Sequence, residues 1–353
     1  MNLRKKLRVS PDFEEKSEPF EKLPVSPDFE EKSEPFEKLL DDLVICILSK
    51  LCSSSSSPSH FISALLVCKR FNQLGMNKLV LSNACSKVFD IRARNWSESA
   101  HRFLKLCVHG GSIEACYFLG MVRFYCMRDR GGGASLMAKA AIKSHAQALY
   151  SLAVIQFNGS GGAKSDRDIR AGIALSARAA NFCHVGALRD LAHCLKNGYG
   201  IKQNKDKGRR LLFRASVREL SSVLRRVGSH GKIQKRHTTG GFGLGFGSDF
   251  LSLLEPNPDP ASRFLVEWFK LNEGELGPGL KLCSYSGCGR PETRPYEFRR
   301  CSVCGVVNYC SRGCQTLDWK AGHKVECSPV GADQWGDMDP NLDGPDIDHN
   351  EVG

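Results

Sequence analysis

The stretch ALYSLA at residues 148–153 recurs, with substitutions, as ACYFLG at 115–120 and as ALRDLA at 187–192. A second short pattern follows each copy: Lys139-Ala-Ala, Arg178-Ala-Ala and Arg214-Ala-Ser. The copies are spaced by 33 to 39 residues, and small Ala and Gly residues at fixed places allow paired helices to pack closely. Self-similarity at such periods is typical of a helical solenoid, in which each pair of helices buries one face against the next. We therefore predict helical repeats over residues 100–227.

The sequence before the repeats, at residues 39–82, predicts a pair of helices. Apolar residues with the spacing of an amphipathic helix follow Asp41 and Asp42: Leu43, Val44, Ile47, Leu48 and Leu51. The serine run 53–57 and Pro58 end this helix, and a second apolar helix is predicted from about Phe61 to Leu74. By composition alone, this segment is an ordinary helical hairpin.

Further segments lie outside these two regions. Residues 1–38 contain a perfect duplication, because Val9–Leu23 recurs as Val25–Leu39, and their Glu, Lys, Pro and Ser content predicts disorder. We also predict a glycine-rich linker over 228–258, a helix over 259–275 that begins at Asp259 and Pro260, and an acidic disordered tail over 328–353.

A cluster of cysteine and histidine residues near the C-terminal end has the spacing of metal ligands. Seven of the 16 cysteines and one histidine make eight donors: Cys283, Cys288, Cys301, Cys304, Cys310, Cys314, His323 and Cys327. Thiolates and imidazoles at short paired spacings suit two tetrahedral zinc ions, and a closed coordination shell makes both ions structural. Cys310/Cys314 and His323/Cys327 are each four residues apart, so we expect a helix to present each pair on one face.

The spacing of this cluster, and the stretch CQTLDWKAGHKVEC at 314–327, closely resemble the MYND zinc finger. The resemblance implies interleaved ligands, with Cys283, Cys288, Cys310 and Cys314 on one zinc and Cys301, Cys304, His323 and Cys327 on the other. The first pair departs from the family pattern, because it is Cys-x4-Cys and not the usual Cys-x2-Cys.

MYND fingers bind short proline-rich peptides of partner proteins. The resemblance therefore implies that Gln315 and Trp319 line a peptide groove, where an exposed indole can stack on proline. The alternative is that Trp319 anchors the core of a small domain that is poor in apolar residues. One side chain can serve both roles.

LLDDLVICILSKL at 39–51 and FISALLVCKRFNQL at 61–74 resemble an F-box, which we place over residues 39–82. Proteins of that family bind a Skp-type adaptor of cullin-based ubiquitin ligases. The resemblance implies the following adaptor-facing or structural residues: Leu39, Leu40, Leu43, Leu48, Leu66, Val67, Cys68 and Phe71. The sequence departs from the family at Leu40, where Pro is usual, and at Phe71, where Trp is common. The repeats resemble Sel-one-like repeats, which are protein-binding scaffolds related to tetratricopeptide repeats.

Composition and charge bear on the class of protein and partner. With 353 residues, 41% of them hydrophobic, the chain can form two or three domains. Its apolar runs are far shorter than the roughly 20 residues that span a membrane, so we expect a soluble protein of the nucleus or cytoplasm. The net charge is +12, with −2 in residues 1–38, −7 in residues 328–353 and +21 between them. Solvated helix faces and zinc-bound thiolates account for much of this excess, and nucleic acid is not the expected partner.

The predicted fold is mainly α, with an F-box helical segment, a helical-repeat solenoid and a small irregular two-zinc MYND finger. The predicted function is that of a substrate-recognition adaptor in a Skp–cullin–F-box ubiquitin ligase, which recruits protein targets, including proline-rich motifs, through its repeats and finger. No residue is then catalytic. The alternative is a MYND scaffold or transcriptional corepressor adaptor without ubiquitin chemistry.

Overall fold

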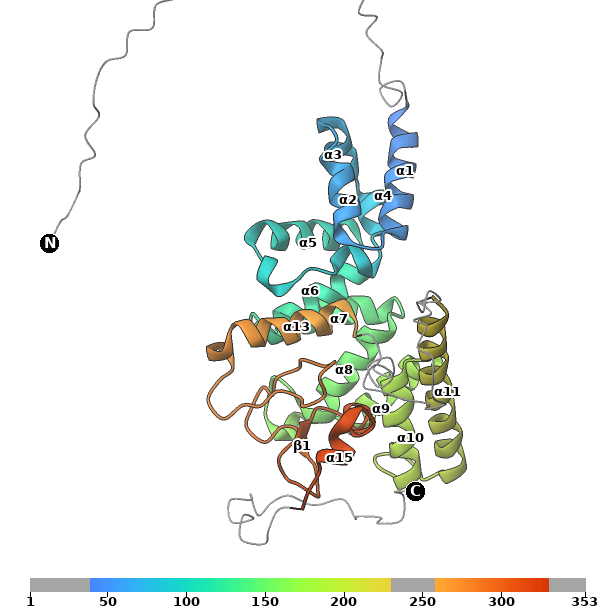
Figure 1. Cartoon of the computed structure of the whole chain (residues 1–353), viewed down its shortest axis with the longest axis vertical. Coiled ribbons are helices and arrows are strands. Elements are labelled where there is room, and N and C mark those ends of the chain that lie inside the picture. Colours follow the sequence, from blue (N-terminus) through green and yellow to red (C-terminus); the bar gives the residue numbers. More distant parts are fainter. Residues whose placement is uncertain (1–38, 230–257, 330–353) are drawn as a thin grey trace, which may run out of the picture. The chain divides into compact units, whose positions relative to one another are not determined.

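The computed structural model of the chain describes residues 39–229 and 258–329. The predictions for the duplicated segment, for residues 230–257 of the linker and for residues 330–353 of the tail lie outside these ranges. The described residues form helices and one small two-stranded sheet (Figure 1), so the prediction of a mainly α fold is confirmed. None of the described helices is both long enough and apolar enough to cross a membrane.

Four helices form the first described part of the chain: α1 (Asp41–Ser54), α2 (Pro58–Leu65), α3 (Lys69–Gly75) and α4 (Lys78–Ser82). The single helix predicted from about Phe61 to Leu74 is wrong, because the chain breaks between α2 and α3. Cys68 is extended, and its sulfur accepts a hydrogen bond from the backbone N–H of Phe71 at 3.4 Å, which begins α3 anew. Two 3-10 turns, η1 (Ser86–Phe89) and η2 (Ala93–Asn95), lead to the repeats.

The repeat region begins with α5 and continues through three helix pairs. Its helices are α5 (Glu98–Gly110), α6 (Ile113–Tyr125), α7 (Arg130–Ile142), α8 (Ala146–Asn158), α9 (Ile169–Asn181), α10 (Val185–Asn197) and α11 (Lys205–Ser229), with a 3-10 turn, η3 (Lys164–Asp166), before α9. α6 packs against α7, α8 against α9 and α10 against α11, and successive pairs pack on one another. The predicted solenoid is therefore confirmed.

The same turn begins the first helix of each pair. Ser112, His145 and His184 are its N-caps, and each side chain accepts a hydrogen bond from the backbone N–H three residues later. The residue before each cap has a left-handed φ: +96° at Gly111, +65° at Ser144 and +60° at Cys183. The cap and its turn therefore repeat together, although the residue types differ.

Two glycines let α6 and α7 approach closely. A Cβ atom on Gly133 would lie 2.6 Å from the backbone nitrogen of Phe124 and 2.7 Å from the carbonyl oxygen of Gly120. A Cβ on Gly120 would lie 2.8 Å from the Met137 side chain. This pair is thus packed backbone to backbone, as the sequence pattern of small residues predicts.

α13 (Pro260–Leu271) returns to the start of the solenoid and packs against α6 and η2 (Figure 1). Asp259 is its N-cap, as predicted, and accepts hydrogen bonds from the N–H groups of Ala261 and Ser262. Ion pairs join Arg263 to Asp90 at 2.7 Å and Arg92 to Glu267. The helix therefore connects the repeats to the η1–η2 segment, and a further 3-10 turn, η4 (Glu273–Glu275), follows it.

The finger has little regular structure. Strand β1 (Arg299–Arg300) pairs antiparallel with β2 (Asn308–Tyr309), with Arg299 opposite Tyr309. α14 (Arg312–Asp318), the π-helical turn η5 (Trp319–His323) and α15 (Lys324–Glu326) complete it. Tyr285, Phe298 and Tyr309 are its buried aromatic side chains.

We predict that Gly133→Ala destabilises the protein by about 1–3 kcal/mol, because the added methyl group meets backbone atoms that cannot move aside. Gly131→Ala is the matched control in the same helix, since nothing lies within 4 Å of its Cβ position. It should leave stability unchanged or raise it by up to about 1 kcal/mol, because Ala favours helix. Urea unfolding measures both, and equal effects of the two substitutions would contradict the close approach.

Candidate functional site

Short backbone turns present the metal ligands of the finger. Cys301 and Cys304 lie in the connection between β1 and β2, where the N–H of Gly305 donates to the carbonyl of Cys301 at 2.9 Å. Gly305 has a φ of +64°, which favours glycine at the end of this turn. Cys310 follows β2 directly. The sheet therefore sets the distance between the two halves of the ligand cluster.

The structure brings Cys283, Cys288, Cys310 and Cys314 together as one buried group. Their sulfur atoms lie within 4.8 Å of one another, and Cys310 Sγ is 3.6 Å from both Cys288 Sγ and Cys314 Sγ. The four-residue gap between Cys283 and Cys288 is thus compatible with a common site.

Cys301, Cys304, His323 and Cys327 form the second group. The sulfurs of Cys301 and Cys327 are 3.8 Å apart, and Cys304 Sγ is 3.6 Å from His323 Nε2. Burial opposes the charge on Cys304, but the N–H groups of Val306 and Val307 donate to its sulfur and lower its pKa. In the same group, burial and the neighbouring Cys301 raise the pKa of the Cys327 thiol to about 12.

Both donor sets fit zinc. A Zn–S bond of about 2.3 Å gives a tetrahedron with edges of about 3.8 Å, which matches the observed separations. A disulfide requires about 2.05 Å and is excluded at these distances. Four thiolates in one set, and three thiolates with one imidazole in the other, are closed structural sites. The finger therefore has two structural zinc sites, with the interleaved ligands that were predicted.

The expectation that a helix presents each i, i+4 pair on one face is wrong for Cys310/Cys314. Ser311 is the N-cap of α14 and accepts from the N–H of Cys314 at 3.0 Å, so Cys310 lies before the helix. The expectation holds for the second pair, because the N–H of Cys327 donates to the carbonyl of His323 at 2.8 Å across the helical turn of α15. A cap therefore sets the geometry of the first pair, and a helical turn sets that of the second.

Arg290 joins the first zinc site to the repeats. It is buried, and its guanidinium donates to Cys288 Sγ at 3.3 Å and to the hydroxyl of Ser151, in α8, at 2.8 Å. Burial opposes the charge on Arg290, but the thiolates of Cys288 and Cys310 hold its pKa well above the ordinary value. Zinc with four thiolates carries a net charge of two minus, so Arg290 neutralises part of a buried anion.

One position of the repeat motif attaches other parts of the chain to the solenoid. The third residue of each motif is Tyr117, Tyr150 or Arg189. Tyr117 donates to Asp259, the N-cap of α13, at 3.2 Å, and Tyr150 is 2.9 Å from Ser311, the N-cap of α14. Arg189 forms a two-fold hydrogen-bonded ion pair with Glu219 in α11 at 2.8 and 2.6 Å.

Asp190 completes the attachment of α14. Its carboxylate accepts from the Tyr150 hydroxyl at 3.0 Å and from the N–H of Gly313 at 2.8 Å. Burial raises the pKa of Asp190 to about 6, even though both donors favour the charged form. A Cβ on Gly313 would lie 3.0 Å from the Tyr150 oxygen and 3.2 Å from the Cα of Gly186, so the first turn of α14 is pressed against α10.

The turn after α8 also contacts the finger. Asn158 Nδ2 donates to the carbonyl of Cys310 at 2.9 Å, and the guanidinium of Arg294 donates to the carbonyls of Asn158 and Gly159. Ser160 donates to the carboxylate of Glu297. Zinc ligands, finger loops and repeat turns thus belong to one interface.

The predicted peptide-binding residues lie on α14 and η5. Gln315 and Trp319 are both half-buried. The indole of Trp319 contacts the ring of the zinc ligand His323 edge to face, with centroids 5.8 Å apart. Trp319 therefore packs on the second zinc site while part of it stays accessible, which is compatible with both roles considered for it.

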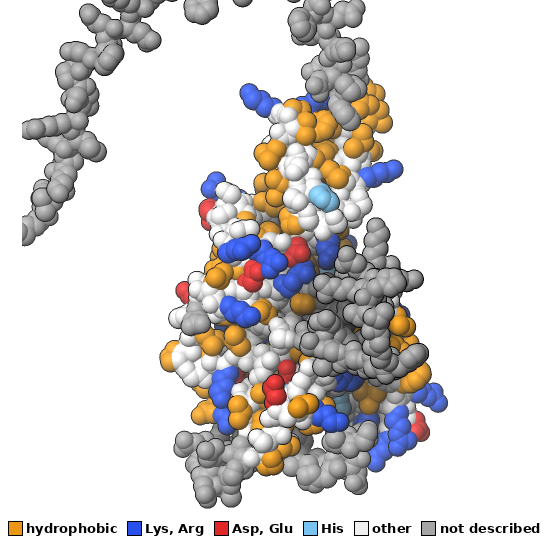
Figure 2. All heavy atoms as spheres, viewed as in Figure 1, with side chains coloured by type: hydrophobic (Ala, Val, Ile, Leu, Met, Phe, Trp, Pro, Cys, Tyr) orange, Lys and Arg blue, Asp and Glu red, His pale blue; other side chains and the backbone are white. Residues whose placement is uncertain are grey.

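The predicted adaptor-facing residues divide by burial. Leu40, Leu43, Leu66, Val67 and Cys68 are exposed, Leu39 and Phe71 are half-buried, and Leu48 is only 1% exposed. Leu48 belongs to the core, which agrees with the structural one of the two roles that the resemblance implies. Ile47 and Ile62 are exposed as well. Figure 2 shows hydrophobic side chains gathered over α1, α2 and α3. We call Leu43, Ile47, Ile62, Leu66 and Val67 the N-terminal apolar face.

The sequence reasoning also missed Arg290, Tyr150 and Asp190. A signal was present for the tyrosine, because a large polar residue stands at the third position of every repeat motif among small and apolar residues. No comparable signal marks Arg290, whose partner Ser151 lies 139 residues away in the chain.

Comparison with known proteins agrees with this architecture. The MYND finger family matches residues 283–327, and a family described as plant tetratrico peptide repeats matches residues 87–195. Two Arabidopsis thaliana proteins, each named an F-box protein, are 56% identical over 306 residues and 55% identical over 297 residues. These alignments cover 82% and 84% of this chain and 79% and 85% of the relatives.

A solved Sel1 repeat protein from Oxalobacter formigenes is 13% identical, with a TM-score of 0.38, and the match covers 66% of this chain and 85% of that one. Fold and site together define a helical-repeat protein that carries a two-zinc MYND finger. The long matches at more than half identity further show that the chain belongs to the F-box protein family of the two Arabidopsis relatives.

We predict that Arg290→Met weakens zinc retention at the first site and lowers the free energy of unfolding by about 3–5 kcal/mol, because the zinc–thiolate charge loses its buried partner. Arg300→Met is the control in the same finger, since the Arg300 guanidinium stacks over the ring of Tyr296 at 5.2 Å and contributes only about 0.5–1 kcal/mol.

A chelator titration with a chromogenic zinc indicator, run beside urea unfolding, measures both quantities. Arg290→Met should release its first zinc at a lower chelator concentration than Arg300→Met. Identical curves for the two variants would contradict the charge-neutralising role of Arg290.

Proposed function

We propose that the protein is a substrate-recognition subunit of a Skp–cullin–F-box ubiquitin ligase. The observation that carries this proposal is the N-terminal apolar face on an F-box family member. Leu66 is 76% and Val67 67% exposed, at the break between α2 and α3 where Cys68 begins a new helix. Contiguous exposed apolar side chains of this kind mark a protein–protein interface.

Such a subunit acts by holding the target close to the subunit that transfers ubiquitin. One end binds the adaptor, another part binds a target, and ubiquitin transfer takes place on a different subunit at a raised effective concentration. Because α14 and the finger loops are fixed to α8 and α10, a target bound at the finger keeps a defined relation to the repeats. The protein itself then needs no catalytic residue, and nucleus or cytoplasm remains its predicted location.

Target recognition is proposed at the finger, where Gln315 and Trp319 would contact a proline-rich segment. This is supported by the half-exposed indole, which rests on His323 and is thereby oriented at low entropic cost. The alternative, a MYND scaffold or corepressor adaptor without ubiquitin chemistry, shares this surface but does not need the N-terminal apolar face.

We predict that Leu66→Asp/Val67→Asp lowers the affinity for a Skp-type adaptor about a hundredfold or more, because two apolar contacts of about 1.5–3 kcal/mol each are replaced by buried charge. Ile142→Asp is the control, since Ile142 is 73% exposed on α7 and lies outside the F-box. A pull-down with purified adaptor and full-length variants measures binding. If the unaltered protein does not bind, the scaffold alternative holds.

We predict that Trp319→Ala abolishes binding of a proline-rich partner peptide while zinc content stays at two ions per chain. Tyr296→Ala is the control, because it removes an aromatic ring of the same finger that is 62% exposed and stacks with Arg300. Fluorescence anisotropy of a labelled peptide and metal analysis give the two readouts. Loss of zinc from Trp319→Ala would reject the groove assignment in favour of a core anchor.

A further inference from the structure

The outer face of α11 carries an apolar stripe that no helix of the described ranges covers. Phe213, Val217, Leu220 and Leu224 follow one another at helical spacing, and their side chains are between 45% and 71% exposed. These residues lie opposite Leu211 and Ala215, which are buried against α10. We call the four residues the α11 stripe.

In an internal repeat, this side of the pair would contact the next helix. α7 packs against α8 and α9 packs against α10, whereas α11 is the last helix of the series among the described residues. The final repeat of a solenoid needs a polar outer face, because no neighbour buries it. The α11 stripe breaks this rule and therefore calls for an occupant.

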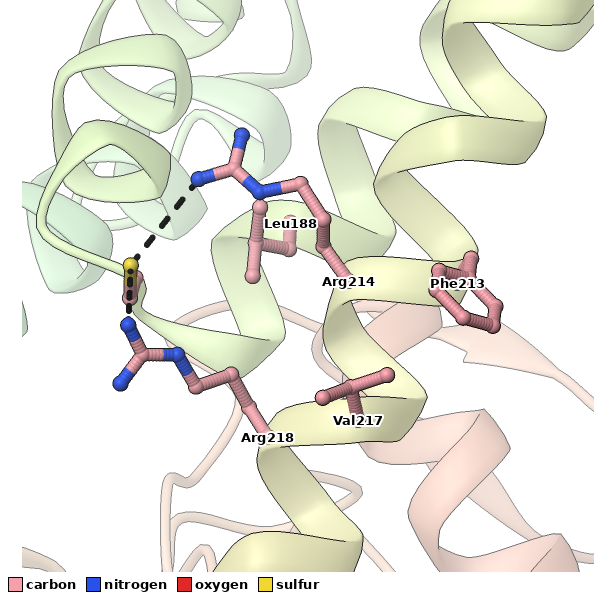
Figure 3. Close-up of a pocket in the computed structure, with 6 residues that line it drawn as sticks. Leu188, Phe213, Arg214, Val217 and Arg218 are labelled. Atoms are coloured by element: carbon pink, nitrogen blue, oxygen red, sulfur yellow. Dashed lines mark hydrogen bonds between the residues drawn. The ribbon is translucent and has the colours of Figure 1, made fainter.

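A row of arginines borders the stripe. Arg210, Arg214 and Arg218 are spaced by four residues and are exposed. Arg214 and Arg218 each direct an N–H toward the Cys183 sulfur, at 3.9 and 3.0 Å, whereas Phe213 points away from it (Figure 3). Within the described ranges, none of the three arginines forms an ion pair with a carboxylate. Each guanidinium has five N–H donors, so Arg214 and Arg218 can donate further hydrogen bonds to the carboxylates of an acidic partner.

A small cavity lies beside the arginines. It has a volume of about 170 Å³ and is lined by Cys183, Leu188, Phe213, Arg214, Val217 and Arg218. Apolar and cationic groups thus share one depression, next to an apolar stripe. The ligand chemistry that fits is an acidic chain segment with interspersed large apolar side chains.

We propose that residues 330–353 of this chain dock on the α11 stripe and its arginine row. The segment carries seven Asp and Glu and no Lys or Arg, and among its acidic residues stand Trp335, Met338 and Leu342. The apolar side chains cover the stripe and the carboxylates pair with the guanidinium groups. This inference does not depend on the proposed ubiquitin-ligase function.

The path of the chain permits this docking. Lys320 in η5 is 3.0 Å from Glu219, so η5, which lies shortly before the end of the finger, contacts α11. Residues 328–332 contain no charge, and five extended residues span about 17 Å, enough to pass around a helix of about 10–12 Å diameter. The acidic residues begin at Asp333. An attached segment also has an effective concentration in the millimolar range, which favours even a weak contact.

Carbodiimide crosslinking of the full chain tests the proposal. Arg214→Lys/Arg218→Lys keeps both positive charges and supplies amines that the reagent can join to carboxylates in contact with them. Lys139 and Lys143 are the built-in control, because they occupy the corresponding positions on α7, in an internal repeat, and are also exposed. We expect crosslinks from the introduced amines to residues 333–351, and none from Lys139 or Lys143.

High salt and substitution of the apolar residues of the α11 stripe give two further tests. At 1 M salt the screening length falls to about 3 Å, so the crosslinks should largely disappear. Adding Leu220→Ser/Leu224→Ser should also reduce them, whereas adding Ile142→Ser should not. Mixing isotopically labelled and unlabelled chains separates contacts within one chain from contacts between two.

Three results would overturn the proposal. Absence of crosslinks to residues 333–351 would do so, as would equal crosslinking of Lys139 and Lys143. Crosslinks found mainly between labelled and unlabelled chains would assign the α11 stripe to a second copy of the protein. Mass spectrometry of the digested products reads all three.

Discussion

The contact of Arg290 with Cys288 and Ser151 is the interaction on which the arrangement of finger and repeats depends. A guanidinium in this buried position is tolerable only beside the anionic zinc site, and that anion in turn needs a cation. Metal binding and docking are therefore coupled. The finger does not fold independently of the solenoid. Arg290 balances the charge of its first zinc site and also donates a hydrogen bond to Ser151 in α8.

The solenoid uses one repeated position for three different attachments. Tyr117 reaches the cap of α13, Tyr150 reaches the cap of α14, and Arg189 reaches α11. The repeat fixes where the side chain at this position lies, and the residue type at the position decides whether it forms a hydrogen bond or an ion pair. Two of the attached groups are N-cap residues, so the tyrosines contact side chains that already satisfy helix ends. Attachment and helix initiation are thereby linked.

Local sequence patterns were sufficient to predict much of the fold and the zinc ligands of this protein. Periodicity and small residues predicted the helix pairs, Asp259 and Pro260 predicted the start of α13, and the spacing of Cys and His predicted the zinc ligands. The failures have long-range or competing causes. A side-chain cap at Cys68 divides a segment whose apolar pattern is continuous. Ser151, which accepts from Arg290, and Gly313, which donates to Asp190, are more than 100 residues away from them in the chain, beyond any local pattern.

The segment after the repeats packs back along them, and this packing changes how the repeats can unfold locally. Stacked repeats ordinarily behave as a one-dimensional array, in which terminal units fray without disturbing distant ones. Here α13 contacts α6, the loop around Arg290 contacts α8, and α14 contacts α10. These attachments brace units that are not neighbours in the array. Local opening of one helix pair must break bonds made by the others, so the repeats and the finger unfold as a single cooperative unit.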